Sequence, residues 1–259
     1  MITPRLTYYD LGDGVTAFST TRHGGMSRGN YAEFNINRYC GDDEAAVTSN
    51  LMRLSAMLGI SPEKVLMPHQ THGTYILPVA DEFLSLNPKT KALLLENTDA
   101  LVTDVSGVCI GVSTADCIPV LLYDPVQKVS AAVHAGWRGT VACIVVKTVQ
   151  RLCQMYGSNP SDIRAVVGPG ISLDNFEVGD EVYQQFAEAG FDMSAISRRY
   201  DKWHIDLPEC NRLQLLEAGL KEANIHASGI CTYDNNNDFF SARRQGIMSG
   251  RIYTGIMMK

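Results

Sequence analysis

The amino-acid sequence predicts a layered fold of the α/β or α+β class. Apolar residues make up 45% of the 259 residues and charged residues 19%, a balance typical of packed globular chains and unlike that of disordered or fibrous ones. An amphipathic helical pattern stands near the amino terminus, and short β-type runs alternate with helical stretches after it. Helices interspersed with strands indicate a sheet covered by helices. No linker, repeat or low-complexity tract interrupts the pattern, so we expect one domain over residues 1–259.

Three stretches have the periodicity and end signals of helices. The first has Asp42 or Asp43 as its N-cap and ends at Gly59. Its apolar residues fall at i, i+4, i+7 and i+11: Val47, Leu51, Leu54 and Leu58. The second is expected over Thr140–Tyr156, and the third over Pro208–Ala223 with proline in its first turn.

Seven short runs have the composition of strands. They are Thr16–Thr20, Ala100–Thr103, Val108–Ser113, Ile118–Tyr123, Val129–His134, Ala165–Val167 and Ile225–Thr232. The fourth and fifth are joined by the turn-forming tetrapeptide at 124–127 and should pair as an antiparallel hairpin. If Tyr123 faces Lys128, the register places Cys117 opposite His134, with their Cβ atoms roughly 5 Å apart on one face. A slip of one residue would separate them.

Charge and cysteine usage exclude several classes of protein. The net charge is -6 and no basic run is present, so nothing in the sequence suits a row of nucleic-acid phosphates. The segment Met1–Gly14 does not resemble a signal peptide, and no apolar run approaches the roughly 18 residues of a membrane helix. Seven scattered cysteines fit reduced thiols better than a disulfide framework. We therefore expect a soluble cytoplasmic enzyme without nucleic-acid or membrane partners.

A cysteine and a histidine on one face suit two kinds of chemistry. They can be two ligands of a metal ion or a nucleophile with its base, and they can also be mere neighbours at a sheet edge. The segment Pro68–Gly73 adds His69 and His72, either of which could complete a set of three metal ligands. Three protein ligands with an open position are typical of catalytic zinc. Histidine and thiolate donors exclude magnesium and calcium and leave zinc, copper or iron.

The loop Ala135–Gly139 follows His134 and leads into the second predicted helix. Its glycines should expose backbone N–H groups at a helix N-terminus, which favours an anion, and Arg138 adds a planar fork of donors. Alone, this loop could equally be a tight turn with Trp137 in the core.

Four ordered motifs carry a resemblance to a known family. They are Q-x-H-G at 70–73, T-D-A-L-V-T at 98–103, A-D-C-I-P-V at 115–120 and H-A-G-W-R-G at 134–139. Further matches lie at 21–27, 35–43, 168–170, 231–232 and 239–244. With these motifs the chain resembles the YfiH family, labelled a multicopper polyphenol oxidase or laccase domain and also described as purine nucleoside phosphorylases. The resemblance implies a layered sandwich with a mixed β-sheet core and flanking helices.

The resemblance also implies a site. It makes His72, Cys117 and His134 the metal ligands, and it chooses His72 over His69. The metal is expected to be zinc, with copper possible. One site would phosphorolyse adenosine, inosine and methylthioadenosine and would also deaminate adenosine, for which a three-ligand zinc activates water.

Phosphorolysis requires binding of an anion, for which arginines are suited. The candidates are Arg138, Arg22 and Arg243. Asp116 is a candidate proton carrier for deamination, although neighbours in a strand point to opposite faces and its side chain could point away from the metal. Ala242 departs from the family, where an aromatic residue often precedes the two arginines, and this puts a substrate role of Arg243 in doubt.

Two rival functions remain. The first is a metal-free cysteine hydrolase or deamidase with Cys117 as nucleophile and His134 as base. The second is a copper polyphenol oxidase, but a multicopper centre needs more histidines than the six of this chain. A non-catalytic binding module is disfavoured by the set of ligands. The preferred nucleoside and the oligomeric state do not follow from the sequence.

Overall fold

The structure is a computed structural model that describes residues 3–259, so Met1 and Ile2, at the start of the amino-terminal segment, lie outside it. The helices are α1 Glu44–Leu58, α2 Asp81–Ser85, α3 Pro88–Leu95, α4 Trp137–Val141, α5 Ile144–Tyr156, α6 Asp180–Glu188, α7 Met193–Ile196, α8 Leu207–Glu217 and α9 Ala242–Gln245. Short 3-10 turns are present at 29–31, 62–64, 160–162, 173–175 and 222–224.

The strands form three sheets among the described residues. The first has the order β1 (Leu6–Tyr9), β2 (Val15–Thr20), β14 (Ile252–Met258), β6 (Cys109–Thr114) and β3 (Val65–Leu66). The second has the order β13 (Ile225–Ala227), β9 (Arg164–Val167), β7 (Ile118–Asp124), β8 (Val129–Ala135), β5 (Ala100–Thr103) and β4 (Ile76–Pro78). The third has the order β10 (Glu177–Val178), β12 (Trp203–Ile205) and β11 (Ser197–Arg199). The first two contain both parallel and antiparallel pairs.

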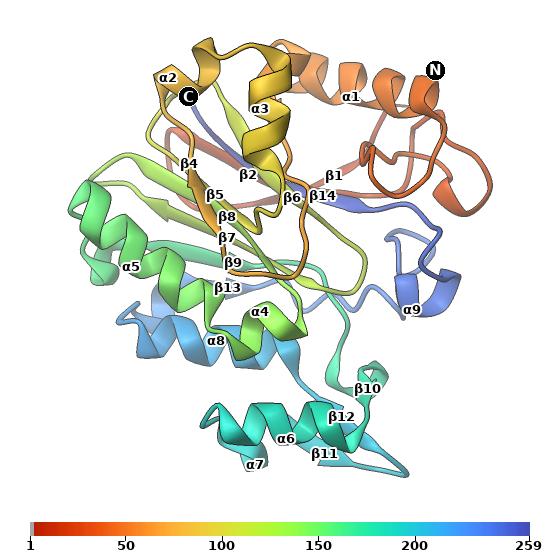
Figure 1. Ribbon diagram of the computed structural model, residues 1–259, viewed down its shortest axis with the longest axis vertical. Coiled ribbons are helices and arrows are strands. Elements are labelled where there is room, and N and C mark those ends of the chain that lie inside the picture. The colour runs from red at the N-terminus through yellow and green to blue at the C-terminus, as the bar shows by residue number, and fades with distance from the viewer. Residues whose placement is uncertain (1–2) are drawn as a thin grey trace.

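The first two sheets are stacked, and helices cover the outer face of each (Figure 1). Helix α1 lies over the five-stranded sheet, while α4, α5 and α8 lie on the outer face of the six-stranded sheet. The three-stranded sheet, with α6 and α7, extends beyond these lower helices. The predicted α/β layered sandwich with a mixed sheet core is confirmed.

Alternate residues of the central strands serve different layers of the core. In β7 and β8, Leu121 and Ala132 face the five-stranded sheet, where they join Ile110 of β6. Their neighbours Val120 and Val133 belong to the cluster that packs against α5 and α8. Because both faces are covered, β7 and β8 are buried at every position and read as continuous apolar runs.

The helix predictions are confirmed in position but not at every boundary. Helix α1 begins after Asp43, whose side chain accepts the N–H of Ala46 at 2.8 Å, and ends at Gly59 in the left-handed region with φ 68°. The second predicted helix is two helices, α4 and α5, because Cys143 has a left-handed backbone with φ 57° between them. The third, α8, ends earlier than predicted, since Gly219 has φ 97°.

All seven predicted strands are present, but one is shorter than predicted and the register of one pair is wrong. The run from Ile225 leaves the sheet after β13, because Gly229 turns the chain with φ 66°. The pairing of Tyr123 with Lys128 is wrong by two residues: Tyr123 faces Ser130, and the position opposite His134 is held by Pro119. A shift of two preserves the face of every side chain, so the predicted cysteine still lies on the same side as the histidine.

The loop between β7 and β8 explains the register error. Asp124 continues β7, and its carboxylate accepts the N–H groups of Val126 at 2.8 Å and Gln127 at 3.1 Å. Lys128 then turns the chain with φ 52°. The turn therefore sits one residue later than its composition predicts.

Within residues 3–259 no helix combines the length and apolarity needed to cross a membrane.

Candidate metal centre

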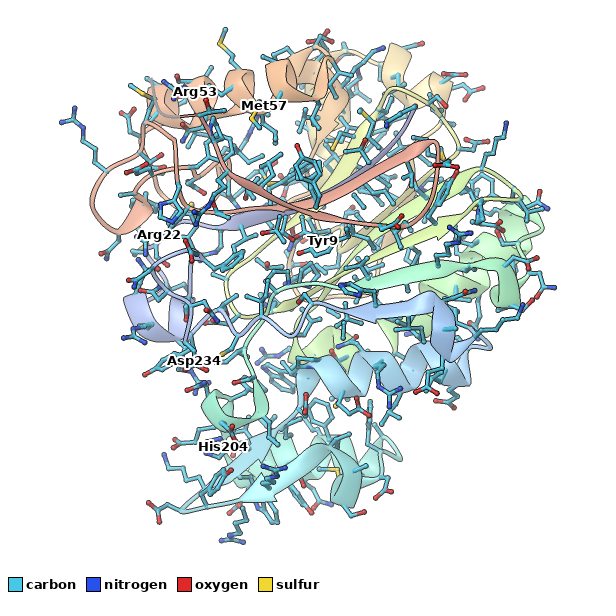
Figure 2. All side chains as sticks on the ribbon, turned by 180° about the vertical axis from the view of Figure 1, so that it is seen from behind. Tyr9, Arg22, Arg53, Met57, His204 and Asp234 are labelled. Carbon is cyan, nitrogen blue, oxygen red and sulfur yellow. The ribbon has the colours of Figure 1, made fainter. Side chains whose placement is uncertain are left out.

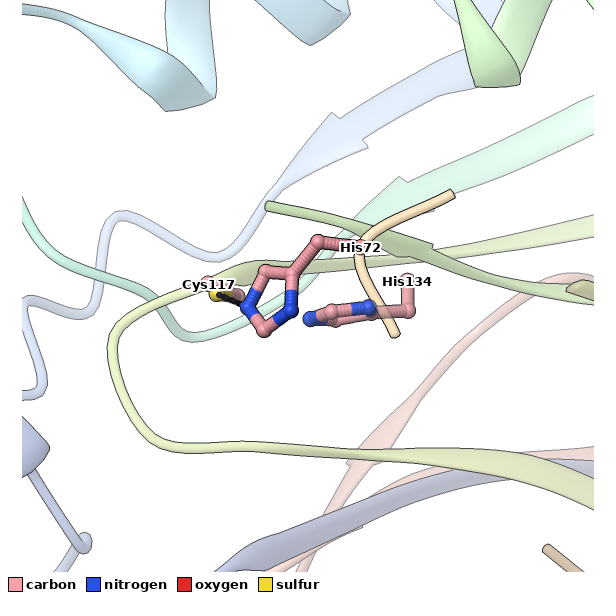
Figure 3. A group of neighbouring side chains, drawn as sticks. All are labelled: His72, Cys117 and His134. Atoms are coloured by element: carbon pink, nitrogen blue, oxygen red, sulfur yellow. Dashed lines mark hydrogen bonds between the residues drawn. The ribbon is translucent and has the colours of Figure 1, made fainter. Parts of the chain in front are cut away.

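Three side chains from separate parts of the chain meet at one point. His72 comes from the loop between β3 and β4, Cys117 from the turn between β6 and β7, and His134 from β8 (Figure 3). Their nitrogen and sulfur donor atoms all lie within 4.8 Å of one another. The Sγ of Cys117 is 3.7 Å from Nε2 of His72, and the two imidazole rings meet edge to face with centroids 4.8 Å apart.

A fully buried carboxylate orients both histidines. Asp99, at the start of β5, accepts a hydrogen bond from Nδ1 of His134 at 2.8 Å. It also accepts the backbone N–H groups of His72 at 2.9 Å and Gly73 at 2.8 Å. Because Nδ1 of His134 is bound to Asp99, Nε2 is the ring nitrogen that faces the cluster and that can bind a metal once it has lost its proton.

The loop that carries His72 is fixed by a second side chain. The amide of Gln70 donates to the carbonyl of Ser113 at 2.8 Å and accepts the N–H of the same residue at 2.7 Å, as a neighbouring strand would. His72 itself has a left-handed backbone with φ 62°. Together these contacts tie the loop to the end of β6, next to the turn of Cys117.

Gly136 is the position where the site tolerates no side chain. A Cβ atom there would lie 2.7 Å from Cδ2 of His72 and 3.1 Å from Sγ of Cys117. Real Cβ atoms essentially never approach other atoms to 2.7 Å, so His72 would have to move. The glycine after His134 is therefore required for close approach to the cluster.

Contacts among Cys117, His134 and Asp99 shift the pKa values of all three groups. Burial alone would raise the pKa of Cys117, but the charge and hydrogen bond of His134, with a smaller contribution from His72, lower that pKa to about 6. Burial would lower the pKa of His134, but Cys117 and Asp99 raise it. Burial also disfavours the ionised form of Asp99, yet its bonds to His134 and to backbone N–H groups keep its pKa below the usual value. The site therefore favours a thiolate beside an imidazolium.

The donor set fits a zinc ion. In a tetrahedral site, Zn–S of about 2.3 Å and Zn–N of about 2.0–2.1 Å place the sulfur and nitrogen roughly 3.6 Å apart. The separation of Cys117 Sγ from His72 Nε2 is 3.7 Å. Two nitrogens and one thiolate leave a fourth position open, as in catalytic sites, and the same set also accepts copper.

A cavity of about 330 Å³ opens beside the cluster. His72, Cys117 and His134 line one side of it, and Asn37 and Arg251 line another. This volume lies at the lower end of the range for small-molecule sites, about 300–1,000 Å³. The cluster thus faces a space that suits a compact organic substrate.

Comparisons with known proteins agree with this geometry. A family model described as multi-copper polyphenol oxidoreductase laccase matches residues 16–259. The chain is 47% identical to a Bacteroides thetaiotaomicron protein named purine nucleoside phosphorylase, over 94% of this chain and 92% of the relative. It is 42% identical to a protein of an unknown prokaryote named adenosine deaminase RL5, over 95% of both chains. The purine nucleoside phosphorylase YfiH of Escherichia coli is 35% identical, over 89% of both chains.

The chain belongs to the YfiH family. The crystal structure of YlmD from Geobacillus stearothermophilus has a TM-score of 0.90 and 32% identity, and covers 97% of this chain and 94% of its own. That of the hypothetical protein YfiH from Bacillus licheniformis has a TM-score of 0.86 and 30% identity, over 95% and 93%. The resemblance seen in the motifs is confirmed.

The structure separates the two histidines of the segment Pro68–Gly73. His72 is in the cluster, whereas Nδ1 of His69 lies 2.6 Å from the carboxylate of Glu96 and its ring stacks on Tyr39 with centroids 4.2 Å apart. His204 lies on the outlying three-stranded sheet (Figure 2) and is not part of the cluster. The metal role of the three clustered side chains stays a prediction.

None of the three arginines predicted to bind substrate lines the cavity, and each makes other contacts. Arg22 lies where the amino-terminal loops meet the segment after β13 (Figure 2), and its guanidinium donates to the carbonyls of Ala32 at 2.8 Å and Asn236 at 2.7 Å. Arg138 is exposed on α4 and stacks over the ring of Trp137 at 4.2 Å. Trp137 itself is only partly buried.

Asp116 and Arg243 are bound to each other through the backbone. One carboxylate oxygen of Asp116 accepts the N–H of Arg243 at 2.6 Å, and the other accepts the hydroxyl of Thr232 at 2.7 Å. The guanidinium of Arg243 donates to the carbonyl of Glu177, at 3.2 Å from each terminal nitrogen. Asp116 thus anchors the start of α9, and its role as a proton carrier stays a prediction.

Sequence reasoning missed three residues of the site. Asp99 and Gln70 stood inside quoted motifs without a role, and Arg251 stood in none. An acidic residue directly before the apolar run Ala100–Thr103 is the available signal for Asp99, because a carboxylate buried with such a run needs a partner. No sequence signal points to Arg251.

Proposed function

We propose that this protein is a zinc-dependent purine nucleoside phosphorylase that acts on adenosine, inosine and methylthioadenosine and also deaminates adenosine. The observation that carries the proposal is the convergence of His72, Cys117 and His134 on a cavity of about 330 Å³. The names of the relatives, purine nucleoside phosphorylase and adenosine deaminase, support both activities. We take His72, Cys117 and His134 as ligands, with zinc preferred and copper possible.

In phosphorolysis, a phosphate oxygen bonds to the anomeric carbon of the ribose as the bond to the purine nitrogen breaks. The electron pair leaves with the purine, which takes up a proton, and the products are ribose 1-phosphate and the free base. In deamination, water adds to the purine ring and ammonia leaves. Bound zinc supplies a Lewis acid for such chemistry.

The residues of this chain have distinct tasks in that scheme. Asp99 holds the ring of His134 in one tautomer and fixes the backbone of the His72 loop. Gln70 keeps that loop on the end of β6. These contacts preorganise the donors, which reduces the cost of assembling the site when substrate binds.

A metal-free cysteine hydrolase is the second candidate, because the pKa of Cys117 is lowered to about 6 beside His134. A nucleophile must be free to attack, whereas a ligand must be bound, so metal separates the two. Chelation should abolish phosphorolysis and would enhance or spare a cysteine hydrolase.

The test is a panel of nucleosides incubated with protein of measured metal content, with and without phosphate. We expect purine release from inosine, adenosine and methylthioadenosine that requires phosphate and yields ribose 1-phosphate from the first two and methylthioribose 1-phosphate from the third. Ammonia should form from adenosine without phosphate. Purine release that is indifferent to phosphate, or that persists after complete removal of metal, would contradict the proposal.

Free cysteines at all seven positions support a reducing compartment, and we propose a cytoplasmic location.

A further inference from the structure

We propose that Arg251 and Thr114 form the subsite for the attacking phosphate, inside the same cavity as the cysteine–histidine cluster. The inference rests on the proposed phosphorolysis and names the residues that would hold its second substrate. Neither residue stands among the candidates that the sequence predicts.

Strand pairing brings Arg251 to the cluster from the far end of the chain. Strand β14 runs antiparallel to β6, with Ile252 facing Thr114. One step further in this register, Arg251 stands beside Ala115, two residues before Cys117. Arg251 and Thr114 both line the cavity that the cluster lines.

The guanidinium of Arg251 is held in place by its own loop. One terminal nitrogen donates to the carbonyls of Ser249 at 2.6 Å and Gly250 at 3.0 Å and to the hydroxyl of Ser249 at 3.2 Å, and the other donates to the carbonyl of Ile247 at 2.9 Å. A guanidinium has five N–H donors. The first nitrogen shares its two among three acceptors and the second uses one, so the Nε–H and one terminal N–H remain for a ligand. Because the loop fixes the group beforehand, little side-chain entropy remains to be lost on binding.

The charge of Arg251 has no partner of opposite sign. Among residues 3–259, no carboxylate forms an ion pair with it. The carboxylate of Asp42 lies near enough for its charge and that of Arg251 both to affect the thiol of Cys40. It accepts a hydrogen bond from the amide of Asn35 at 2.8 Å and forms no ion pair with Arg251. A half-buried cation without a counter-ion is costly unless an anion binds it, and arginine matches the fork of phosphate oxygens.

A second polar group in the cavity wall also lacks a partner. The hydroxyl of Thr114 is buried and makes no hydrogen bond within the described structure. Buried hydroxyls without a partner are uncommon, and this one could donate to a phosphate oxygen. A hydroxyl without a partner on β6 and a cation without a counter-ion next to β14 thus share one cavity.

The other candidate arginines do not meet these conditions. The guanidinium of Arg22 is bound by two carbonyls and that of Arg243 by one, while Arg138 is exposed on Trp137. None of the three lines the cavity beside the cluster.

The experiment measures the rate of inosine phosphorolysis against phosphate concentration for five proteins: wild type, Arg251→Gln, Arg251→Lys, Thr114→Val and Arg199→Gln. Arg199 is an exposed arginine on β11, stacked over Trp203 at 5.0 Å, and serves as the matched control. We expect Arg251→Gln to raise the KM for phosphate at least about tenfold, because hydrogen bonds to charged groups are the strong ones. Arg251→Lys should raise it less, Thr114→Val by roughly threefold to tenfold, and Arg199→Gln should leave it unchanged. The KM for inosine should move much less in every variant.

Three results decide the matter. If wild type needs phosphate but both Arg251→Gln and Thr114→Val keep its KM for phosphate, the subsite is elsewhere and the inference fails. A rise in the KM for inosine alone would overturn it too, because the residues would then bind the nucleoside. A wild-type protein indifferent to phosphate would instead refute the proposed function. If Arg251→Gln fails to fold, calorimetric titration of wild type and Thr114→Val with inorganic phosphate decides: equal affinities would contradict the subsite, and weaker binding to Thr114→Val would support it.

Discussion

The two sides of the cavity are built in different ways. The side with Cys117 and His134 lies at the open end of the β7–β8 hairpin, and buried Asp99, directly before the adjacent strand β5, orients His134. The side with Arg251 depends on β14, which reaches β6 from the end of the chain. The first side is thus fixed by local pairing and a buried carboxylate, and the second by long-range pairing and backbone carbonyls. We expect changes on the first side to remove metal and changes on the second to weaken binding of an anion.

The largest effect on metal content and activity should follow loss of one of the predicted metal ligands. Cys117→Ala and His134→Ala each remove a group of the cluster, so both should lose bound zinc and phosphorolysis together. Cys153→Ala is the matched control, since this cysteine lies on α5 away from the cavity. Metal analysis and initial rates measure the contrast. Full activity in Cys117→Ala would refute both the metal role and the nucleophile role of this residue.

A smaller loss, of affinity for zinc, should follow Asp99→Asn, which keeps the size of the side chain but not its charge. The amide has one acceptor oxygen instead of two, so it cannot accept from His134 and His72 on one oxygen and from Gly73 on the other, and it has no negative charge to hold His134. Loss of such a partner typically weakens metal binding by about 10- to 100-fold. A competition titration with a zinc chelator measures it. Wild-type affinity in Asp99→Asn would show that the carboxylate only supports the fold.

When metal is absent, the thiol of Cys117 should stay reactive toward alkylating reagents down to a pH of about 6. Burial would raise its pKa, but His134 and His72 lower it to about 6, so the thiolate persists at pH 7 and is lost as the pH falls through about 6. An ordinary cysteine, with a pKa of about 8.5, loses reactivity between pH 9 and 8 instead. Iodoacetamide labelling followed by mass spectrometry gives the profile at each cysteine. Zinc should protect Cys117, and equal labelling with and without zinc would speak against its role as a ligand.

The smallest effect should be that of Arg138→Ala. As a phosphate ligand, the role that the sequence predicts, its loss would raise the phosphate requirement about 10- to 100-fold, at about 1.4 kcal/mol per factor of ten. The exposed position on Trp137 and the absence of this residue from the cavity wall instead predict a change within about twofold. The KM for phosphate distinguishes the two. A tenfold rise would restore Arg138 to the anion site.

The same contrast explains what the sequence could predict. The longer helices α1, α5 and α8, half of the described strands and the shared side of Cys117 and His134 follow from local periodicity, and the register error of two residues left that side unchanged. The break at Cys143 did not follow, because a left-handed backbone at a non-glycine residue has no compositional signal. Nor did Arg251, since its place depends on which strand pairs with β6. A site formed by elements adjacent in the sequence is therefore easier to predict than one formed by segments far apart in the chain.

The most direct test of the central claim is a titration of metal-free protein with zinc while phosphate-dependent cleavage of inosine is followed. We expect activity to rise in proportion to bound zinc and to level off at about one ion per chain, with no such response in Cys117→Ala. Full phosphorolysis in protein free of metal, or activity that does not follow bound zinc, would contradict the assignment of His72, Cys117 and His134 as the metal centre.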